Sequence, residues 1–470
     1  MKKTPQKVKK APQKKRKNNK KNLSVVAGAI LIAVILTTVA FSFVLSISGE
    51  VKPQPGYTTT EPTTTEPPVP YVTSTATIGS AGDILIHKPI LESAKGSEGY
   101  SFQKLFTYTK SVTSAYDYFV LNLETTLAGT EDGRTYTTYP RFNSPDSLLD
   151  AVEALGTDCL LTANNHSYDT KSYGFLRTID KVDEKGFDHV GSRKTAEDKK
   201  YFVKNIKDIS FGFTCYTYET PYDSTTIKAL NGIEMNETTS PLVNSFDYDH
   251  LDTFYTEIEE QLKLMKGAGA EVSVIYVHWG DEYKLSANSY QKAIAQKLCD
   301  IGFDVIIGGH PHVVEPVELI TSTDGKHKTV CVYSVGNFLS NQRRNLMGLK
   351  TGHTEDGLIF EMTFSKYSDG TVVFDSVDVT PTWVHLYNEG SKQVHSVVPL
   401  SANLNAESLG LNKTSDGLSQ AKASYERTMA LVKEGTDACN EYLSSLPRPD
   451  EETTEEDTTV SISDATDVAA

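Results

Sequence analysis

VSVIYVHWGDE at residues 272–282 and YQKAIAQKLCDIGFDVIIGGHPH at residues 290–312 are the stretches that decide the fold. Each contains a short apolar run, which is typical of a buried strand. Residues 290–300 place apolar side chains at helical spacing, and Gly302 follows where a C-cap glycine belongs. Strands that alternate with helices in this way predict an α/β fold.

The alternation continues over most of the chain. Further strands are expected at 73–81, 118–123, 159–162, 209–216 and 329–334, and further helices at 145–155, 173–185 and 247–266. Ser144 is a candidate N-cap for the first of these helices, with Pro145 in its first turn. Two later strands, 358–365 and 372–380, flank Asp369-Gly370 and predict a hairpin, so the sheets should be mixed.

Polar residues that can bind metals or transfer protons follow several of these strands. In chain order they are Asp83 with His87, Asn122 with Glu124, Asn165 with His166 and Asp169, His278 with Glu282, His310 with His312, and Asn337. Sites in α/β folds lie at the carboxyl ends of strands, so these residues are expected to meet. Their oxygen and nitrogen atoms suit hard or borderline divalent metals. The paired glycines Gly308-Gly309 would let a metal or substrate approach the backbone beside His310.

The motifs around these residues resemble those of one known family. Gly-Asp, Asn-x-Glu, Asn-Asn-His-x-x-Asp, His-Trp-Gly-x-Glu-Tyr, Gly-x-His-Pro-His and Ser-x-Gly-Asn-Phe occur in this order between residues 81 and 338. The set resembles the CapA family of poly-γ-glutamate capsule synthesis proteins, which is similar to calcineurin-like metallophosphoesterases in fold and site. The resemblance implies a layered sandwich of mixed β-sheets flanked by helices.

The resemblance also implies roles for the site residues. Two divalent ions would be held by seven ligands: Asp83, His87, Glu124, Asn165, His278, His310 and His312. The imidazoles of His278, His310 and His312 favour Mn, Zn or Fe over Mg or Ca. Glu124 would occupy the bridging place, and His166, with Asp169 beside it, would be the general acid. Asn122, Glu282 and Asn337 would line the site. Such a metal pair activates a water for phosphoester displacement.

Two positions depart from the calcineurin-like pattern. The first motif there is Asp-x-His, whereas His87 stands four residues after Asp83. Either His87 fills that place from a bent loop or the first metal lacks one imidazole. Glu124 stands where that pattern has the shorter Asp. These departures leave open the metal's identity, and also a site that binds metal or glutamate without hydrolysing a phosphoester.

The N-terminal segment predicts a membrane anchor. Residues 1–22 hold ten Lys and one Arg with no acid, and residues 23–49 carry no charge and are mostly apolar. A span of about 20 apolar residues crosses a bilayer, and flanking Lys stays cytoplasmic. We therefore expect a single-pass cell-membrane protein with a cytoplasmic N-terminus and an extracellular main domain. A cleaved signal peptide is the alternative.

The rest of the chain divides by composition. Residues 50–70 are rich in Thr and Pro and predict a linker, and residues 71–400 are expected to form the main domain. Residues 401–446 predict a helical extension, with its helix at 415–433. Residues 447–470 predict an acidic disordered tail. The five widely spaced cysteines suggest buried free thiols, although a disulfide stays open. Because the net charge is −15, nucleic-acid binding is not expected.

Three functions remain open at this stage. The first is a metal-dependent hydrolase of phosphoesters within poly-γ-glutamate synthesis or export. The second is a non-catalytic accessory protein whose partners are membrane subunits of a poly-γ-glutamate synthase. The third is a cell-wall binding domain with a degenerate site.

Overall fold

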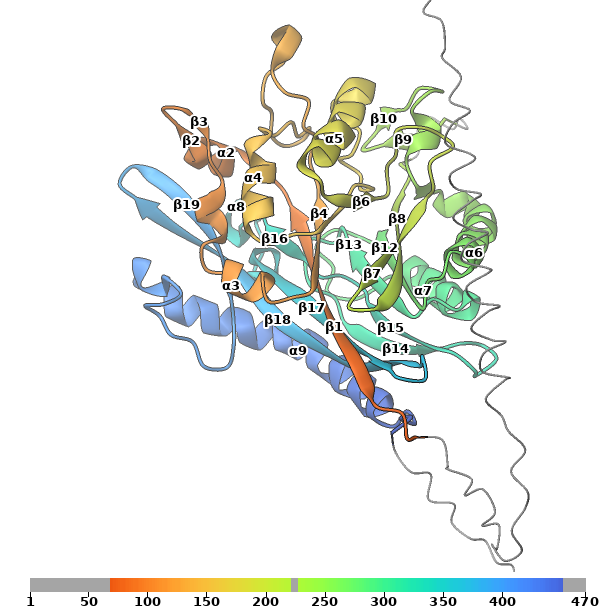
Figure 1. Ribbon diagram of the computed structural model, residues 1–470. Helices are drawn as coiled ribbons and strands as arrows, with labels where there is room; N and C mark the ends of the chain where they lie inside the picture. Colours follow the sequence, from red (N-terminus) through yellow and green to blue (C-terminus); the bar gives the residue numbers. More distant parts are fainter. Residues whose placement is uncertain (1–67, 221–226, 451–470) are drawn as a thin grey trace, which may run out of the picture. The chain divides into compact units, whose positions relative to one another are not determined.

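The computed structural model of the chain describes residues 68–220 and 227–450 (Figure 1). Its first large sheet has the strand order β19-β18-β17-β1-β4-β5-β6, with β16 paired to β1. The strands are β1 (Val72–Ile84), β4 (Tyr118–Leu123), β5 (Cys159–Leu161), β6 (Asp188–Val190), β16 (Asn337–Leu339), β17 (Asp356–Tyr367), β18 (Val372–Glu389) and β19 (Lys392–Pro399). Strands β1, β4, β5 and β6 run parallel, whereas β17 to β19 pair antiparallel.

The second large sheet has the order β11-β8-β12-β13-β15-β14, with β7 paired to β8. Its strands are β7 (Tyr201–Ile206), β8 (Ile209–Tyr218), β11 (Ser245–Phe246), β12 (Val272–His278), β13 (Val305–Gly309), β14 (Val317–Thr321) and β15 (Lys328–Val332). Strands β8, β12, β13 and β15 run parallel to one another. Strand β7 pairs antiparallel with β8, and β14 pairs antiparallel with β15. Every residue of β12 is buried, as expected for a parallel strand covered on both faces.

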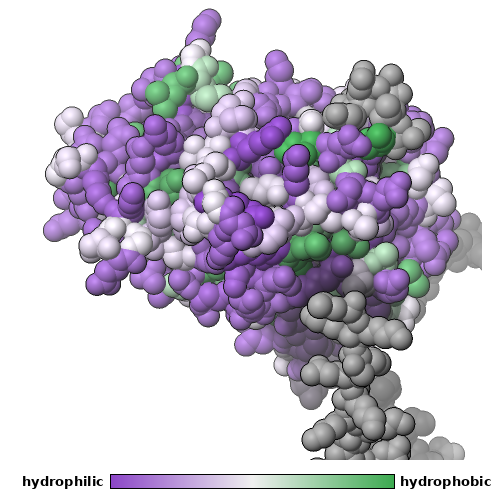
Figure 2. All heavy atoms as spheres, turned by 90° about the horizontal axis from the view of Figure 1, so that it is seen from above, coloured by the Kyte–Doolittle hydropathy of each residue, from purple (hydrophilic) through white to green (hydrophobic). Residues whose placement is uncertain are grey.

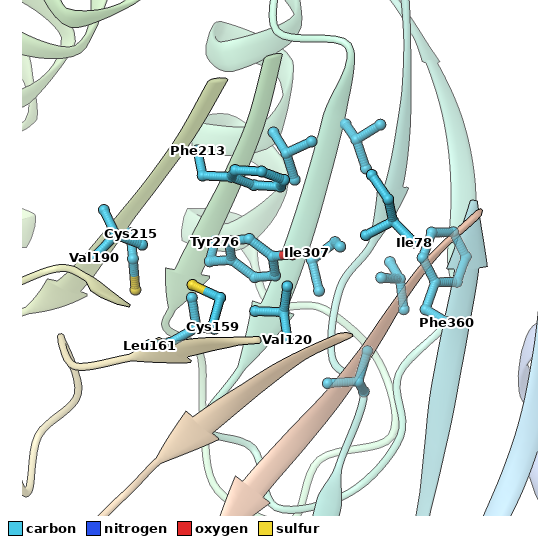
Figure 3. Close-up of a cluster of buried hydrophobic side chains, with 14 of the residues drawn as sticks. Ile78, Val120, Cys159, Leu161, Val190, Phe213, Cys215, Tyr276, Ile307 and Phe360 are labelled. Atoms are coloured by element: carbon cyan, nitrogen blue, oxygen red, sulfur yellow. The ribbon is translucent and has the colours of Figure 1, made fainter. Parts of the chain in front are cut away.

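The main hydrophobic core lies between the two sheets (Figure 3). Ile78 and Val120 of the first sheet and Tyr276 and Ile307 of the second sheet belong to the same buried cluster. The Tyr276 hydroxyl lies 2.9 Å from the Ser80 hydroxyl, which satisfies a polar group that would otherwise be buried alone. The five cysteines are buried and free, so the thiols behave as small apolar side chains.

Helices cover the outer faces of the two sheets. On the first sheet α2 and α4 contribute to one buried cluster, and on the second α6 and α7 contribute to another. The helices are α2 (Lys88–Ala94), α3 (Lys110–Thr113), α4 (Ser147–Ala154), α5 (Lys171–Lys185), α6 (Leu251–Gly267), α7 (Ser289–Ile301), α8 (Arg344–Met347) and α9 (Gly417–Ser444). Two short pairs, β2 (Lys95–Gly96) with β3 (Gly99–Tyr100) and β9 (Ala229–Leu230) with β10 (Ile233–Glu234), lie outside the large sheets.

This architecture confirms the predicted α/β layers of mixed sheets flanked by helices. Gly302, with φ of 102°, is the left-handed C-cap of α7, as predicted. The N-cap prediction at Ser144 is wrong, because α4 begins at Ser147 and the Ser144 hydroxyl lies 2.8 Å from that of Thr125. The C-terminal helix is longer than predicted and packs against β18 and β14.

The predicted membrane topology needs correction. Among the helices of the described residues, none is both long and apolar enough to cross a membrane. The longest, α9, has 28 residues but carries charged side chains along its length. The structure thus contradicts the single-pass localisation expected above. Residues 23–49, on which that expectation was based, lie outside the described residues.

Candidate metal centre

The carboxyl ends of strands from both sheets meet at one place. Asp83 at the end of β1 pairs in register with Asn122 of β4 and Asn337 of β16. In the second sheet, His278 at the end of β12 pairs with Gly309 at the end of β13. Parallel strands therefore align residues that are far apart in the chain, as the strand-end pattern predicted.

Two overlapping groups of side chains within the described residues could each hold a metal ion. The first is Glu124, His278 and His310, and the second is Asp83, Glu124 and His312. In each group the ligand atoms lie within 4.8 Å of one another, and all five residues are buried. Glu124 belongs to both groups, which is the arrangement a bridging carboxylate requires.

Unpartnered buried atoms fit a cation at this place. Both carboxylate oxygens of Glu124 and Nδ1 of His310 have no hydrogen-bond partner within the described part of the chain. Oδ2 of Asp83 makes no hydrogen bond of good geometry there either, although His312 Nδ1 lies 3.2 Å from it. Leaving such atoms buried without a partner costs about 1–3 kcal/mol each, and more for charged groups. A divalent ion in each of the two groups would give these atoms a partner. The donor set therefore fits a metal centre.

The electrostatics agree with this interpretation. Burial and the neighbouring charge of Asp83 raise the pKa of Glu124. Burial also acts to raise the pKa of Asp83, but His312 and His278 outweigh it and the pKa is lowered. Burial lowers the pKa of His278 to about 3 and that of His310 well below its ordinary value. Neutral imidazoles are the form that binds metals.

Amide side chains surround the two groups. Asn165 Oδ1 lies 2.8 Å from His278 Nε2, so both atoms face the first group. Asn122 donates to Asp83 Oδ1 at 2.7 Å, and Asn337 Oδ1 lies 3.1 Å from His312 Nδ1. These contacts orient the ligands, as hydrogen-bonding neighbours do in metal sites.

His166 and Asp169 form a buried pair beside the ligands. His166 Nδ1 lies 2.7 Å from Asp169 Oδ2, which also accepts the backbone N–H of Phe142 at 2.6 Å. A carboxylate at Nδ1 fixes the tautomer and leaves Nε2 to exchange protons. The arrangement suits a general acid.

Besides the amide side chains and the His166–Asp169 pair, two further predicted residues, His87 and Glu282, belong to neither group. His87 is the N-cap residue of α2 and has an extended backbone conformation. Its Nδ1 accepts the backbone N–H of Asn341 at 3.3 Å, and its ring meets Phe142 edge-on. Glu282 is exposed beyond the end of β12.

The backbone of the His-Pro-His segment is unusual. His310 has φ of 95° and His312 has φ of 58°, a region that non-glycine residues seldom adopt. Such strain persists where surrounding structure fixes it and gathers at functional sites. Of the two glycines before His310, Gly309 faces the site as expected, because a Cβ there would lie 3.3 Å from Asp83 Oδ1. Gly308 has a different role, because a Cβ there would lie 1.8 Å from the Tyr333 carbonyl oxygen. It allows close packing between β13 and the end of β15.

Sequence reasoning missed two residues of the site. Asn231, in the turn between β9 and β10, donates to Asp169 Oδ1 at 3.1 Å and lies 3.3 Å from His166 Nδ1. The dipeptide Asn231-Gly232 signals a hairpin turn but not a contact with a distant pair. Phe142 packs edge-on between His87 and His166, and an isolated Phe after a Pro-Arg pair gives no such signal.

Comparison with known proteins finds a family that matches most of this region. The family model described as Bacterial capsule synthesis protein PGA_cap matches residues 77–342. This is more than half of the 470 residues, and it contains both ligand groups and the His166–Asp169 pair.

Two curated relatives are similar to the chain. PGA biosynthesis protein CapA of Bacillus subtilis (strain 168) is 24% identical over 306 residues, which cover 65% of this chain and 70% of the relative. Capsule biosynthesis protein CapA of Bacillus anthracis is 26% identical over 272 residues, which cover 57% of this chain and 60% of the relative.

Proposed function

The chain belongs to the bacterial capsule synthesis protein family PGA_cap, and we propose that it acts in poly-γ-glutamate capsule synthesis as a divalent-metal-dependent hydrolase of phosphoesters. The similarity to the two CapA proteins supports the role in capsule synthesis. The observation that carries the hydrolase proposal is the unpartnered, buried Glu124 carboxylate, which is shared by two groups of ligand-type residues.

Each group of residues has a part in the proposed reaction. Bound metal ions would supply an activated water and a Lewis acid for the phosphoryl oxygen. Glu124, with imidazoles from the second sheet and Asp83 from the first, would hold these ions. His166 donates a proton from Nε2 to the leaving oxygen, and Asp169 at Nδ1 stabilises the imidazolium that gives it up.

A second candidate is a non-catalytic accessory role with the subunits of a poly-γ-glutamate synthase. The absence of His87 from the group around Asp83 favours it, because within residues 68–220 and 227–450 that group then has only Glu124 and His312 as further ligand-type residues. A weakly ligated metal would bind or bridge carboxylates of the polymer without splitting an ester.

The test uses the full chain, loaded separately with Mn, Zn or Fe. We expect about one or two bound ions per chain by elemental analysis, and turnover of at least one class of phosphoester. A His310→Ala, His312→Ala double variant removes one imidazole from each group and should lose most of the metal and the turnover. His250→Ala, an exposed histidine paired with Asp247, is the matched control and should keep both.

The outcomes separate the candidates. Metal content unchanged in the double variant would show that these groups are not the metal site. Full metal loading of the parent without turnover of any ester would favour the accessory role.

A further inference from the structure

We propose that the pocket beside His166 and Asp169 binds a carboxylate of a chain of γ-linked glutamate, with Arg141 as the cation that recognises it. The proposal rests on the proposed role in poly-γ-glutamate synthesis: such a chain has one free carboxylate on each residue and no phosphoester, so the pocket holds the polymer beside the metal centre and the polymer is not the ester that is cleaved. In the proposal, Arg141 positions that chain and takes no part in bond breaking.

The pocket lies in the segment between β4 and α4, which reaches beyond the strand ends at the top of Figure 1. It has a volume of about 520 Å³, within the range of ligand pockets. Its lining includes Arg134, Thr138, Arg141 and Asp169. Since Asp169 is the partner of His166, a group held here lies next to the proposed proton donor.

The segment is fixed to the site and is not a loose loop. Asn143 accepts the N–H of Ala128 at 2.7 Å and donates to the carbonyl of Thr135 at 2.8 Å. Phe142, next to Arg141, is bonded through its N–H to Asp169. The base of Arg141 is therefore held at a constant distance from the His166–Asp169 pair.

Two arginines, Arg134 and Arg141, line the pocket, although the chain as a whole is acidic with a net charge of −15. Arg134 is occupied: it pairs with Asp132 at 3.1 Å and stacks on Tyr173 at 3.6 Å. Arg141 is exposed and has no ion-pair partner in the described residues. A guanidinium presents a planar fork that matches a carboxylate with two parallel hydrogen bonds.

The surroundings favour a polar chain over an apolar ligand. The face seen in Figure 2, viewed from above, is mostly hydrophilic with small, separate hydrophobic patches. Thr135, Thr137 and Thr138 add hydroxyl groups to the pocket lining. An acidic protein repels a polyanion unless a local cation holds it, so a single free arginine beside the site has a large influence on where such a chain binds.

The experiment measures binding of a fluorescent γ-linked glutamate oligomer to the full chain by fluorescence anisotropy, at several salt concentrations. Arg141→Gln should weaken binding about tenfold and flatten its salt dependence, as expected for one lost charge-assisted contact. Lys326→Gln, which removes an exposed cation in the turn between β14 and β15, is the control and should leave binding unchanged. Inorganic phosphate is tested as a second probe.

The outcomes decide the proposal. Equal oligomer affinity of Arg141→Gln and the parent overturns it, and so does a variant that weakens phosphate binding alone, because the pocket would then hold a phosphate. Metal content and phosphoester turnover are measured on the same samples. If the parent binds the oligomer through Arg141 but neither binds metal nor hydrolyses esters, the subsite stands and the proposed hydrolase function fails.

Discussion

At the scale of single residues, His166 is the side chain that separates catalysis from scaffolding. It is joined to Asp169 and Asn231 and belongs to neither ligand group. His166→Ala should lower turnover by about 10²–10⁴-fold and leave the metal content unchanged, because a general acid contributes about that much. Esters with alkoxide leaving groups should lose more than activated aryl esters, which leave without a proton.

The control for this variant is Asn231→Ala, which removes a neighbour of the pair but no proton donor. Its loss of turnover should be smaller and equal for both ester types. If His166→Ala slows both ester types equally and lowers the unfolding temperature, His166 only packs within the fold.

The residue scale also shows what sequence could reveal about the site. Six predicted site residues lie at or shortly after the ends of strands: Asp83, Glu124, Asn165, His278, His310 and His312. Because sites in α/β folds lie at the carboxyl ends of strands, the sequence predicted that these residues would lie close together, and in the structure they do. His87 follows β1 as well, but its direction depends on how the chain enters α2. Asn231 reaches the site from a separate hairpin, and no local pattern encodes that contact.

At the scale of elements, a substitution of Gly82 tests whether the pairing of β1 with its neighbour sets the position of Asp83. A Cβ on Gly82 would lie 1.8 Å from the carbonyl oxygen of Gly336, so Gly82→Ala forces β1 away from β16. We expect a loss of about 2–3 kcal/mol in the free energy of unfolding, together with weaker metal binding. Gly267→Ala, at the end of α6 with no atom near the added Cβ, should be close to neutral in chemical denaturation. Equal stability of the two variants would contradict this account.

The start of α7 carries a pH-dependent contact. Glu315 is fully buried, accepts from Gln291 Nε2 at 2.6 Å, and burial raises its pKa to about 7. A raised pKa favours the folded state below the unfolded value, near 4.5, and that contribution disappears as pH rises through about 7. Glu315→Gln should therefore be more stable than the parent at pH 8, by on the order of 3 kcal/mol, and equal to it near pH 4. Urea unfolding at both pH values measures the difference, and a constant difference would refute the assignment.

The helices and strands differed in how accurately the sequence predicted them. The parallel strands β4, β8, β12 and β13 are continuous apolar runs and were predicted within a few residues. Strands β7, β14 and β19 were missed, because they are edge strands or mix exposed and buried residues. The end of α9 was also missed, since its last turns bury only small or isolated apolar residues against β18 and β14.

For the whole molecule, the sequence predicted the layers but not how they are joined. Alternating strands and helices indicate an α/β fold, whereas the order of the strands in each sheet depends on contacts between residues far apart in the chain. The ligand groups depend on that order. Asp83 and Glu124 lie at or directly after strand ends of the first sheet, and His278, His310 and His312 lie at or shortly after strand ends of the second.

Metal bound at this place would therefore link the two sheets, and its removal should destabilise the whole two-sheet unit. A ligand that binds only the folded state adds about 2.7 kcal/mol when its concentration is 100 times Kd. We expect a chelator to lower the unfolding temperature by several degrees in one cooperative step. Glu124→Gln removes the shared carboxyl group, whose ionisation is opposed by burial and by the charge of Asp83, so that its pKa is raised. That variant should be as stable as the metal-free parent or more so, and a chelator should not change its unfolding temperature. His250→Ala should respond to the chelator like the parent. A chelator effect of equal size in Glu124→Gln would place the stabilising metal elsewhere in the chain.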